Sequence, residues 1–214
     1  MRTSATRASA DRTGLEPVRV IACGMLAREV LAVKEQLGLG HLDVRCLPAE
    51  LHYYPDRIPA AMDAAITEAR AEGFRHVFVG YADCGTGGML DRVLERQGVK
   101  RMAGPHCFAF YQGAEAFAEI GDADMTTFYM TDFLCRHFEA FFLKPLGLDR
   151  HPELATDYFG HYEKVVYLAQ SDDPALDRVA EDAARMLGLA YERRFTGYGD
   201  LVPELAGAAM PVTA

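Results

Sequence analysis

Short apolar segments alternate with longer amphipathic segments along the chain. Seven of the apolar segments have the length of a strand, and they lie at residues 18–23, 42–47, 76–81, 100–103, 127–130, 164–169 and 190–195. Between them, apolar residues recur at helical spacing, as Ile58, Met62, Ile66 and Ala69 do. This alternation of strands and helices predicts a parallel sheet that carries helices on both of its faces.

The predicted fold class is α/β, with a single-domain, Rossmann-like, three-layer arrangement around one mostly parallel sheet of about seven strands. An open sheet is favoured over a (β/α)8 barrel, because that barrel typically takes about 250 residues. The chain has 214 residues. We expect the domain to span residues 18–207, residues 1–17 to form a disordered tail, and the end of the domain from Pro203 to be frayed.

The chain is acidic, with 22 Lys and Arg against 31 Asp and Glu and a net charge of −9. No block of basic residues is present, so nucleic acids and anionic membrane surfaces are not expected as partners. The longest apolar runs have strand length, whereas a membrane-spanning helix needs about 20 apolar residues. Five widely spaced cysteines and a first segment without an apolar stretch predict free thiols in the cytoplasm.

Three cysteines lie at or just after the ends of predicted strands. Cys23 ends the first strand, Cys84 follows the third and Cys107 follows the fourth. Ligands of open parallel sheets bind beyond the carboxyl ends of the strands, so we expect these thiols to converge at one edge. Two histidines compete for a fourth position there: His106 adjoins Cys107, and His52 follows the second strand. Of the two, we expect His52 to line the pocket and His106 to cap or orient it.

Three interpretations of the chemistry of these cysteines and histidines remain open. Three thiolates and one imidazole suit tetrahedral zinc, with Cys23, Cys84, Cys107 and His106 as the metal ligands. Thiolates alone also hold iron–sulfur clusters, although the ferredoxin spacings and any CxxC motif are absent. In the third interpretation the three thiols pack as small hydrophobic side chains, which is common for free cysteines.

The remaining cysteines and histidines are expected to have structural or surface positions. Cys46 lies inside an alternating strand and Cys135 lies on a helix rich in aromatic residues, so both are predicted to belong to the core. His41 and the other histidines are predicted to lie at the surface or at element ends.

The turn after the third strand is rich in glycine. In Asp83-Cys-Gly-Thr-Gly-Gly88, glycines allow backbone N–H groups to approach an anion at the start of a helix. Gly85, Gly87 and Gly88 are therefore candidate cofactor-binding residues for a single phosphate or carboxylate. Neither the GxGxxG fingerprint nor a Walker lysine is present, and a plain tight turn is the alternative interpretation.

We expect a pocket for a small-molecule substrate at this edge of the sheet. The candidate catalytic side chains are His52, Tyr81 and Asp83, which the predicted topology brings to the same rim. The adjacent Tyr53 and Tyr54 are expected to form part of a loop over the crevice.

Four segments carry a family resemblance. They are Ile21-Ala-Cys-Gly24, Leu47-Pro-Ala-Glu-Leu-His52, Gly80-Tyr-Ala-Asp-Cys-Gly85 with Gly87-Gly88, and Pro105-His-Cys107 followed by Gly113. On these segments the chain resembles an uncharacterised domain-of-unknown-function family of bacteria and methanogenic archaea, over residues 18–200. The resemblance implies that the family's cysteines fall on Cys23, Cys84 and Cys107. The chain departs from the family pattern at Tyr53-Tyr54 and at Phe110-Tyr111-Gln112.

Members of that family are often encoded beside corrinoid-dependent methyltransferases and corrinoid proteins. The resemblance therefore implies a corrinoid protein or a methyltransferase as a partner. Together with the cysteines, it leads us to expect a Cys-ligated metal-dependent enzyme of one-carbon and methyl-transfer metabolism. Two alternatives remain: a non-catalytic accessory protein that handles a metal or a corrinoid, and a Rossmann-like domain with structural thiols.

Overall fold

The computed structural model describes residues 15–120 and 125–210. These residues fall into two compact units. Unit 1 runs up to Phe110 and resumes at Asp200, and unit 2 comprises Tyr111–Gly199. Of the predicted N-terminal tail, only residues 15–17 are described, and β1 begins directly after them.

Unit 1 is built on a parallel sheet in the order β2-β1-β3-β4. Its strands are β1 (Val18–Cys23), β2 (Leu42–Leu47), β3 (His76–Gly80) and β4 (Lys100–Arg101). All six residues of β1 are buried, as expected for a parallel strand covered on both faces. Its helices are η1 (Gly24–Leu26), α1 (Ala27–Gln36), η2 (Ala49–Tyr53), η3 (Pro55–Arg57), α2 (Ile58–Ala71), α3 (Met89–Gln97), the start of α4 (Cys107–Gln112), and α10 (Leu201–Ala208).

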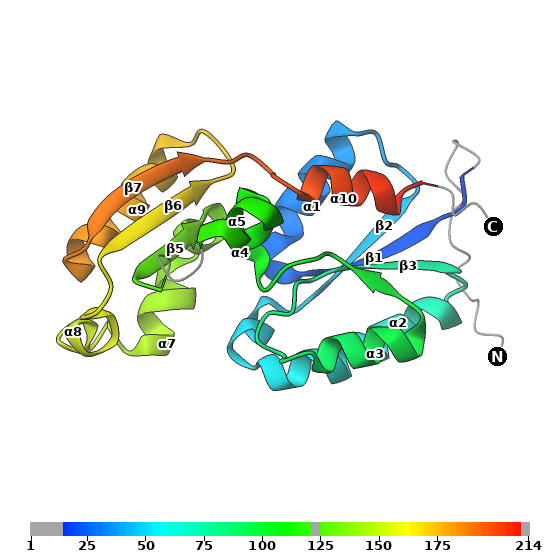
Figure 1. Cartoon of the computed structure of the whole chain (residues 1–214), viewed down its shortest axis with the longest axis horizontal. Coiled ribbons are helices and arrows are strands. Elements are labelled where there is room, and N and C mark those ends of the chain that lie inside the picture. Colours follow the sequence, from blue (N-terminus) through cyan, green and yellow to red (C-terminus); the bar gives the residue numbers. More distant parts are fainter. Residues whose placement is uncertain (1–14, 121–124, 211–214) are drawn as a thin grey trace, which may run out of the picture. The chain divides into compact units, whose positions relative to one another are not determined.

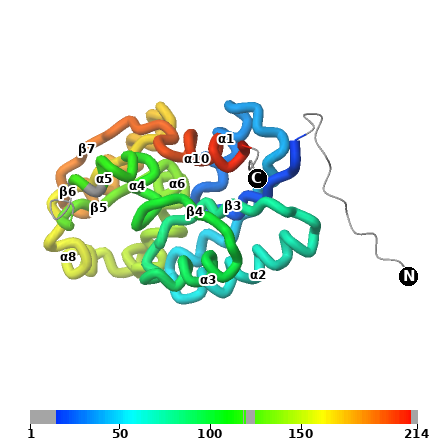
Figure 2. Tube along the Cα trace, turned by 45° about the vertical axis from the view of Figure 1, so that its right-hand side comes forward, coloured from blue at the N-terminus to red at the C-terminus, as the bar shows by residue number. Residues whose placement is uncertain are grey.

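Helices cover both faces of this sheet. Helices α1 and α10 lie on one face, and α2 and α3 lie on the opposite face (Figure 1). Although α10 is the last helix of the chain, it packs beside the first long helix, α1 (Figure 2). The carboxyl ends of β1 and β3 are thus enclosed between two helical layers, and the loops that follow them form the edge at which the cysteines lie.

Unit 2 contains a second parallel sheet in the order β5-β6-β7. Its strands are β5 (Thr127–Thr131), β6 (Lys164–Ala169) and β7 (Ala190–Phe195). Its helices are α5 (Ala114–Ile120), α6 (Asp132–Arg136), the π-helical turn η5 (Glu139–Leu143), α7 (Lys144–Leu146), α8 (Leu154–Phe159) and α9 (Pro174–Leu187). Helix α9 packs on β6 and β7. It begins where the sequence predicts, because the Asp173 carboxylate accepts a 2.9 Å hydrogen bond from the Ala175 N–H.

The structure confirms an α/β fold with parallel strands at the seven predicted places. It differs from the prediction in dividing them between two sheets, where one was expected. Strand β4 consists of only two residues, both charged, and among the described strands β5 pairs with β6 alone. So short a strand offers few backbone groups for a further neighbour. In the described part of the chain the first sheet therefore ends at β4.

Two local predictions are wrong, and His41, which was expected at the surface or at an element end, directly precedes β2. The segment from Pro203 is helical in α10, because Leu201 and Leu205 are buried on its inner face. Cys46 is exposed, since it lies on β2 at the edge of its sheet. His41 is buried, and its Nε2 lies 3.0 Å from the carbonyl oxygen of Ala209. Among the described residues, no helix combines the length and the apolar character that crossing a bilayer requires.

Candidate functional site

A small pocket lies at the carboxyl edge of β1 and β3 in unit 1. Its polar lining comes from Cys23, His52, Tyr81, Cys84 and Cys107, and its apolar lining from Met25, Leu26, Ile58, Ala82 and Phe110. We call it the thiol pocket. Its cavity of about 10 Å³ has room for about one water molecule. The structure thus brings the three cysteines from strand ends together, with a histidine and a tyrosine.

Backbone hydrogen bonds hold two of the thiol-bearing segments side by side. The N–H of Asp83 donates to the carbonyl oxygen of Gly104 at 3.1 Å, and the N–H of Cys84 donates to that of Pro105 at 2.8 Å. The chain that follows β3 is thereby fixed against the chain that leads to Cys107. The approach of Cys84 to Cys107 depends on main-chain contacts.

A close backbone approach at Gly24 places the loop that carries His52. A Cβ at Gly24 would lie 2.8 Å from both the carbonyl oxygen of Leu47 and the nitrogen of Ala49. Only glycine lets the chain after β1 pass so near the end of β2. The loop that continues through η2 is thus held against the residue that follows Cys23.

Each of the three thiols has a backbone N–H directed at it. Met25 supplies one for Cys23, Ala82 for Cys84, and the Cys107 and Phe108 amides for Cys107. Such donors stabilise a thiolate. Desolvation by burial outweighs them.

Burial raises the pKa of all three thiols, and that of Cys84 to about 12. The charges also act on one another: Cys23 raises the pKa of Cys84, and both raise that of Cys107. The three groups are therefore neutral near pH 7. Their mutual effect is a second sign that they lie together.

Cys84 has a left-handed backbone conformation, with φ of +50°. This conformation costs energy for residues with a Cβ and is frequent at functional sites. Among the described residues outside glycine, Cys84 is alone in having a positive φ. The turn thus keeps a strained cysteine at a place where glycine would fit with less strain.

Tyr81 lies deeper than the sequence suggests. We expected it on the rim, but its side chain is only 1% exposed. The Cys23 thiol is near enough for each group to perturb the pKa of the other. Burial, followed by this neighbour, raises the pKa of Tyr81 far above its usual value, so the hydroxyl stays protonated.

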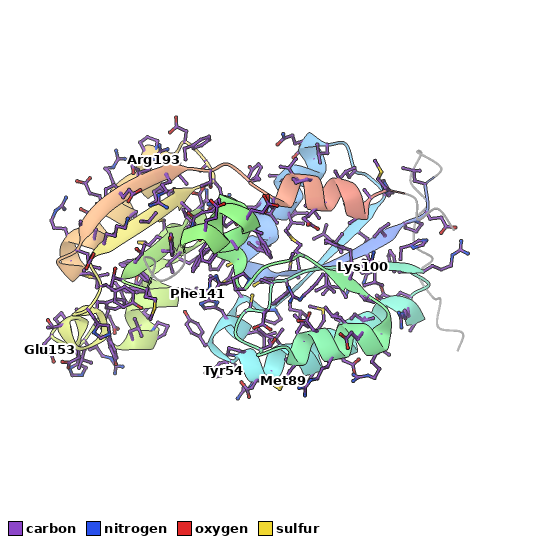
Figure 3. All side chains as sticks on the ribbon, in the orientation of Figure 1. Tyr54, Met89, Lys100, Phe141, Glu153 and Arg193 are labelled. Atoms are coloured by element: carbon purple, nitrogen blue, oxygen red, sulfur yellow. The ribbon has the colours of Figure 1, made fainter. Side chains whose placement is uncertain are left out.

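His52 lines the pocket, as expected, and the loop that carries it exposes two tyrosines. Burial lowers the pKa of His52, which favours a neutral imidazole near pH 7. Tyr53 is 37% exposed and Tyr54 is 47% exposed. The Arg57 guanidinium lies 4.3 Å from the centre of the Tyr54 ring, which is labelled in Figure 3. Because burial keeps its imidazole neutral, His52 is available as a base or as a ligand.

Asp83 organises the glycine-rich turn and does not line the pocket. Its carboxylate accepts hydrogen bonds from Thr86 Oγ1 at 2.7 Å, the Gly88 N–H at 2.9 Å and the Gly87 N–H at 3.2 Å. Burial alone would raise the pKa of Asp83, but these bonds and the Arg101 charge keep it below its usual range. Asp83 thus acts as the internal anion of this turn.

The hydrogen bonds accepted by Asp83 contradict the anion site that the sequence predicted at Gly85, Gly87 and Gly88. The amides of Gly87 and Gly88 are already used by Asp83, so they do not offer an external anion the site that we expected. Gly85 packs against Pro55, whose Cγ would lie 3.5 Å from an added Cβ. The three glycines shape the turn that presents Cys84 and do not line the thiol pocket.

The predicted metal ligands converge only in part. Cys23, Cys84 and Cys107 line the pocket, whereas His106 does not. Within residues 15–120 and 125–210, no three His, Cys, Asp or Glu side chains are positioned as they stand to hold a metal ion. The donor types of the three cysteines suit a thiophilic metal.

Sequence reasoning missed the apolar part of the lining. Met25 and Leu26 belong to η1, Ile58 begins α2 and Phe110 lies in α4. Helical periodicity marks such residues as core without showing that a cavity adjoins them. The Ala82 amide, which faces Cys84, left no signal in the sequence because any residue supplies a backbone N–H.

Comparison with known proteins gives a family without an assigned activity. No curated protein and no solved structure matches the chain. A family model described as "Protein of unknown function (DUF1638)" matches residues 46–204. The matched region contains His52, Tyr81, Cys84 and Cys107, and Cys23 precedes it. Because the match covers most of its length, the chain belongs to the DUF1638 family.

Proposed function

We propose that this protein binds one thiophilic metal ion, with Zn²⁺ as the first candidate, through Cys23, Cys84 and Cys107. The observation that carries the proposal is the arrangement of the thiol pocket. Three thiols from three separate segments surround a cavity of about 10 Å³, and each has a backbone N–H directed at it. Thiolate sulfurs are preferred ligands of zinc.

The electrostatics of the pocket also favour a cation. Three neighbouring thiols cannot all ionise near neutral pH, because burial and mutual repulsion raise their pKa values. A bound divalent cation supplies the missing positive charge and displaces the thiol protons. The backbone N–H groups then stabilise the thiolates that form.

The size of the cavity supports a single ion. Room for about one water molecule suits one metal atom and is too little for an iron–sulfur cluster. Ligation requires the sulfurs to move closer together than they stand. A change of χ1 rotamer moves a cysteine sulfur without moving its backbone. We expect this adjustment on binding.

If zinc were held by Cys23, Cys84 and Cys107, it would supply Lewis-acid chemistry that lowers the pKa of a thiol or a water at the pocket. His52, neutral at the same pocket, is suited to accept the proton that such a group releases. We propose methyl transfer to an activated thiol as the reaction class: the Co–C bond of a methylcob(III)alamin donor would break, the methyl group would pass to the thiolate sulfur to give a thioether, and cob(I)alamin would remain. A corrinoid is far larger than the cavity, so a corrinoid methyl donor would be presented from outside by a partner protein.

A second candidate function is metal handling without catalysis. The apolar remainder of the lining favours it, because His52 is the one basic side chain among the lining residues. Incubation of the zinc-loaded protein with methylcobalamin and a small thiol separates the two. Formation of the methyl thioether supports the enzyme. Zinc transfer to a chelator without any methyl transfer supports the carrier.

Metal binding itself is tested with purified protein stripped by a chelator and titrated with Zn²⁺ under reducing conditions. We expect one zinc per chain and the release of about three protons per metal. Cys23→Ser, Cys84→Ser and Cys107→Ser each weaken binding at least about tenfold. Cys46→Ser is the matched control, since that thiol is exposed and does not line the pocket. The absence of stoichiometric zinc, or an equal loss in the control, refutes the proposal.

A further inference from the structure

We propose that residues 50–57 form a lid over the thiol pocket, and that this lid opens to admit any molecule larger than water. The lid lies in the connection between β2 and α2, and its His52 lines the pocket. The inference concerns access to the three thiols. It goes beyond the proposed function, because it holds whether or not the pocket binds a metal ion.

The thiol pocket is too small for a substrate as it stands. Its cavity of about 10 Å³ has room for about one water molecule. Pockets for small molecules usually have volumes of about 300–1,000 Å³. A ligand therefore reaches the thiols only after part of the pocket wall has moved.

The wall of the pocket is thinnest at His52. Of the residues that line the pocket, all within the described part of the chain, His52 alone is exposed to solvent. Cys84 is half-buried, and the other lining residues are buried. Displacing His52 therefore connects the cavity to solvent, whereas an opening elsewhere would require core residues to move.

The lid contributes little to the core of unit 1. No residue of Ala49–Tyr53 or Pro55–Arg57 is buried. Tyr54, which is labelled in Figure 3, is 47% exposed. Segments with few buried apolar contacts open at a small cost in free energy, without unfolding of the whole domain. The lid thus has the burial pattern of a segment that opens locally.

The lid also keeps its own shape through hydrogen bonds within the loop. Three backbone hydrogen bonds of 2.9–3.2 Å run from the N–H groups of Leu51, Tyr54 and Arg57 to the carbonyl oxygens of Pro48, Leu51 and Tyr54. Bonds of such short span need not break when the loop moves as one body.

Two fixed points bound the lid, and a proline holds it closed. Before the lid, Ala49 is held by the close approach of Gly24, and after it the 1% exposed Ile58 begins α2. Between these points, Pro55 packs against Gly85 of the glycine-rich turn. Loss of the Pro55 ring should therefore favour the open lid.

Thiol modification of the purified wild-type protein, free of metal and at one pH, tests the lid. Initial rates of modification by iodoacetamide are measured at each cysteine by peptide mass spectrometry, at several urea concentrations below the unfolding transition. Cys46 is exposed and Cys135 is buried in unit 2, so they are the references for free access and for unfolding. The rates of the three pocket cysteines should hardly change with urea, because lid opening exposes little surface, whereas the Cys135 rate should rise steeply.

Pro55→Gly should raise the modification rates of the three pocket cysteines about 2–5-fold, because glycine allows the open lid more conformations. The rates of Cys46 and Cys135 should not change. Pro152→Gly is the matched control, since it makes the same exchange at an exposed position of unit 2. It should leave the pocket cysteines at their wild-type rates.

His52→Ala gives a second test that does not depend on Pro55. It removes the exposed part of the wall and should also raise the modification rates of the pocket cysteines. His161→Ala, at an exposed position of unit 2, is its control and should have no effect on them.

Two outcomes overturn the inference. One is wild-type pocket cysteines whose rates follow urea as steeply as that of Cys135, because they are then reached only by unfolding. The other is wild-type rates in both Pro55→Gly and His52→Ala, or in His52→Ala alone if Pro55→Gly does not fold. Zinc takes no part in these measurements, so their failure leaves the proposed function standing.

Discussion

The backbone N–H of Cys84 donates a 2.8 Å hydrogen bond to the carbonyl oxygen of Pro105. The bond joins the turn after β3 to the segment that leads to Cys107, two residues further along the chain. Because main-chain atoms make this contact, cysteine substitutions should remove the thiols without displacing the segments. The thiol pocket is therefore suited to testing by mutation.

Gly24→Ala should destabilise unit 1. The new Cβ would lie 2.8 Å from the carbonyl oxygen of Leu47 and from the nitrogen of Ala49, both of which are backbone atoms. Relief requires the loop that carries His52 to move, and overpacking of this kind costs about 1–3 kcal/mol. Urea unfolding measures the change.

Gly207→Ala is the control, because its Cβ meets nothing within 4 Å in an exposed part of α10. The control should be stabilised by about 0.5–1 kcal/mol. Equal effects of the two substitutions would contradict the close approach at Gly24.

Cys84→Gly should give a more stable metal-free protein than Cys84→Ala. Both variants lack the thiol, but only glycine adopts the φ of +50° without strain. The difference should be about 1 kcal/mol in the free energy of unfolding. Denaturant titration of the two proteins side by side checks it. An alanine variant as stable as the glycine variant would show that the turn is not strained at this position.

Asp132→Ala should be among the most destabilising substitutions in unit 2. The side chain is 1% exposed, and its carboxylate accepts hydrogen bonds from the Tyr167 hydroxyl at 2.7 Å, the Gln170 N–H at 3.0 Å and the Arg136 guanidinium at 3.0 Å. Removing one partner of a buried charged network costs about 3–5 kcal/mol.

Asp172→Ala is the control, because that carboxylate is 88% exposed in its ion pair with Arg193, labelled in Figure 3. It should change stability by less than about 0.5 kcal/mol. A comparable loss in both variants would argue against the buried network.

The acid sensitivity of unit 2 should depend on Glu192. Hydrogen bonds from Arg194 at 2.6 Å and Lys164 at 3.0 Å lower the pKa of this carboxyl group to about 2, from an ordinary value of 4.5. An acid with a lower pKa in the folded state stabilises the fold above its unfolded pKa, and this contribution is lost as the pH falls toward 2. Glu192→Gln should therefore lose less stability than the wild type on acidification from pH 5 to pH 3, as followed by urea titrations across that range. An unchanged slope would show that the pair does not contribute.

The sequence by itself determined the kinds of elements and the places where several of them begin or end. Strand and helix periodicities are local properties, so the seven strand positions and the start of α9 at Asp173 could be read directly. The convergence of Cys23, Cys84 and Cys107 also followed from the sequence. Carboxyl ends of parallel strands share one edge, and β1, β3 and β4 belong to one sheet.

Only the tertiary structure decided which strands pair, because pairing depends on contacts between distant segments. It ended the first sheet at a β4 of two residues and gave β5 a different neighbour. It placed His52 in the pocket and left His106 outside it, since the approach at Gly24 holds one loop in position. It filled the glycine turn with the Asp83 carboxylate and buried the Tyr81 side chain beside the Cys23 thiol. Side-chain hydrogen bonds of this kind depend on ångström-scale placement, which neither hydrophobic pattern nor residue spacing encodes.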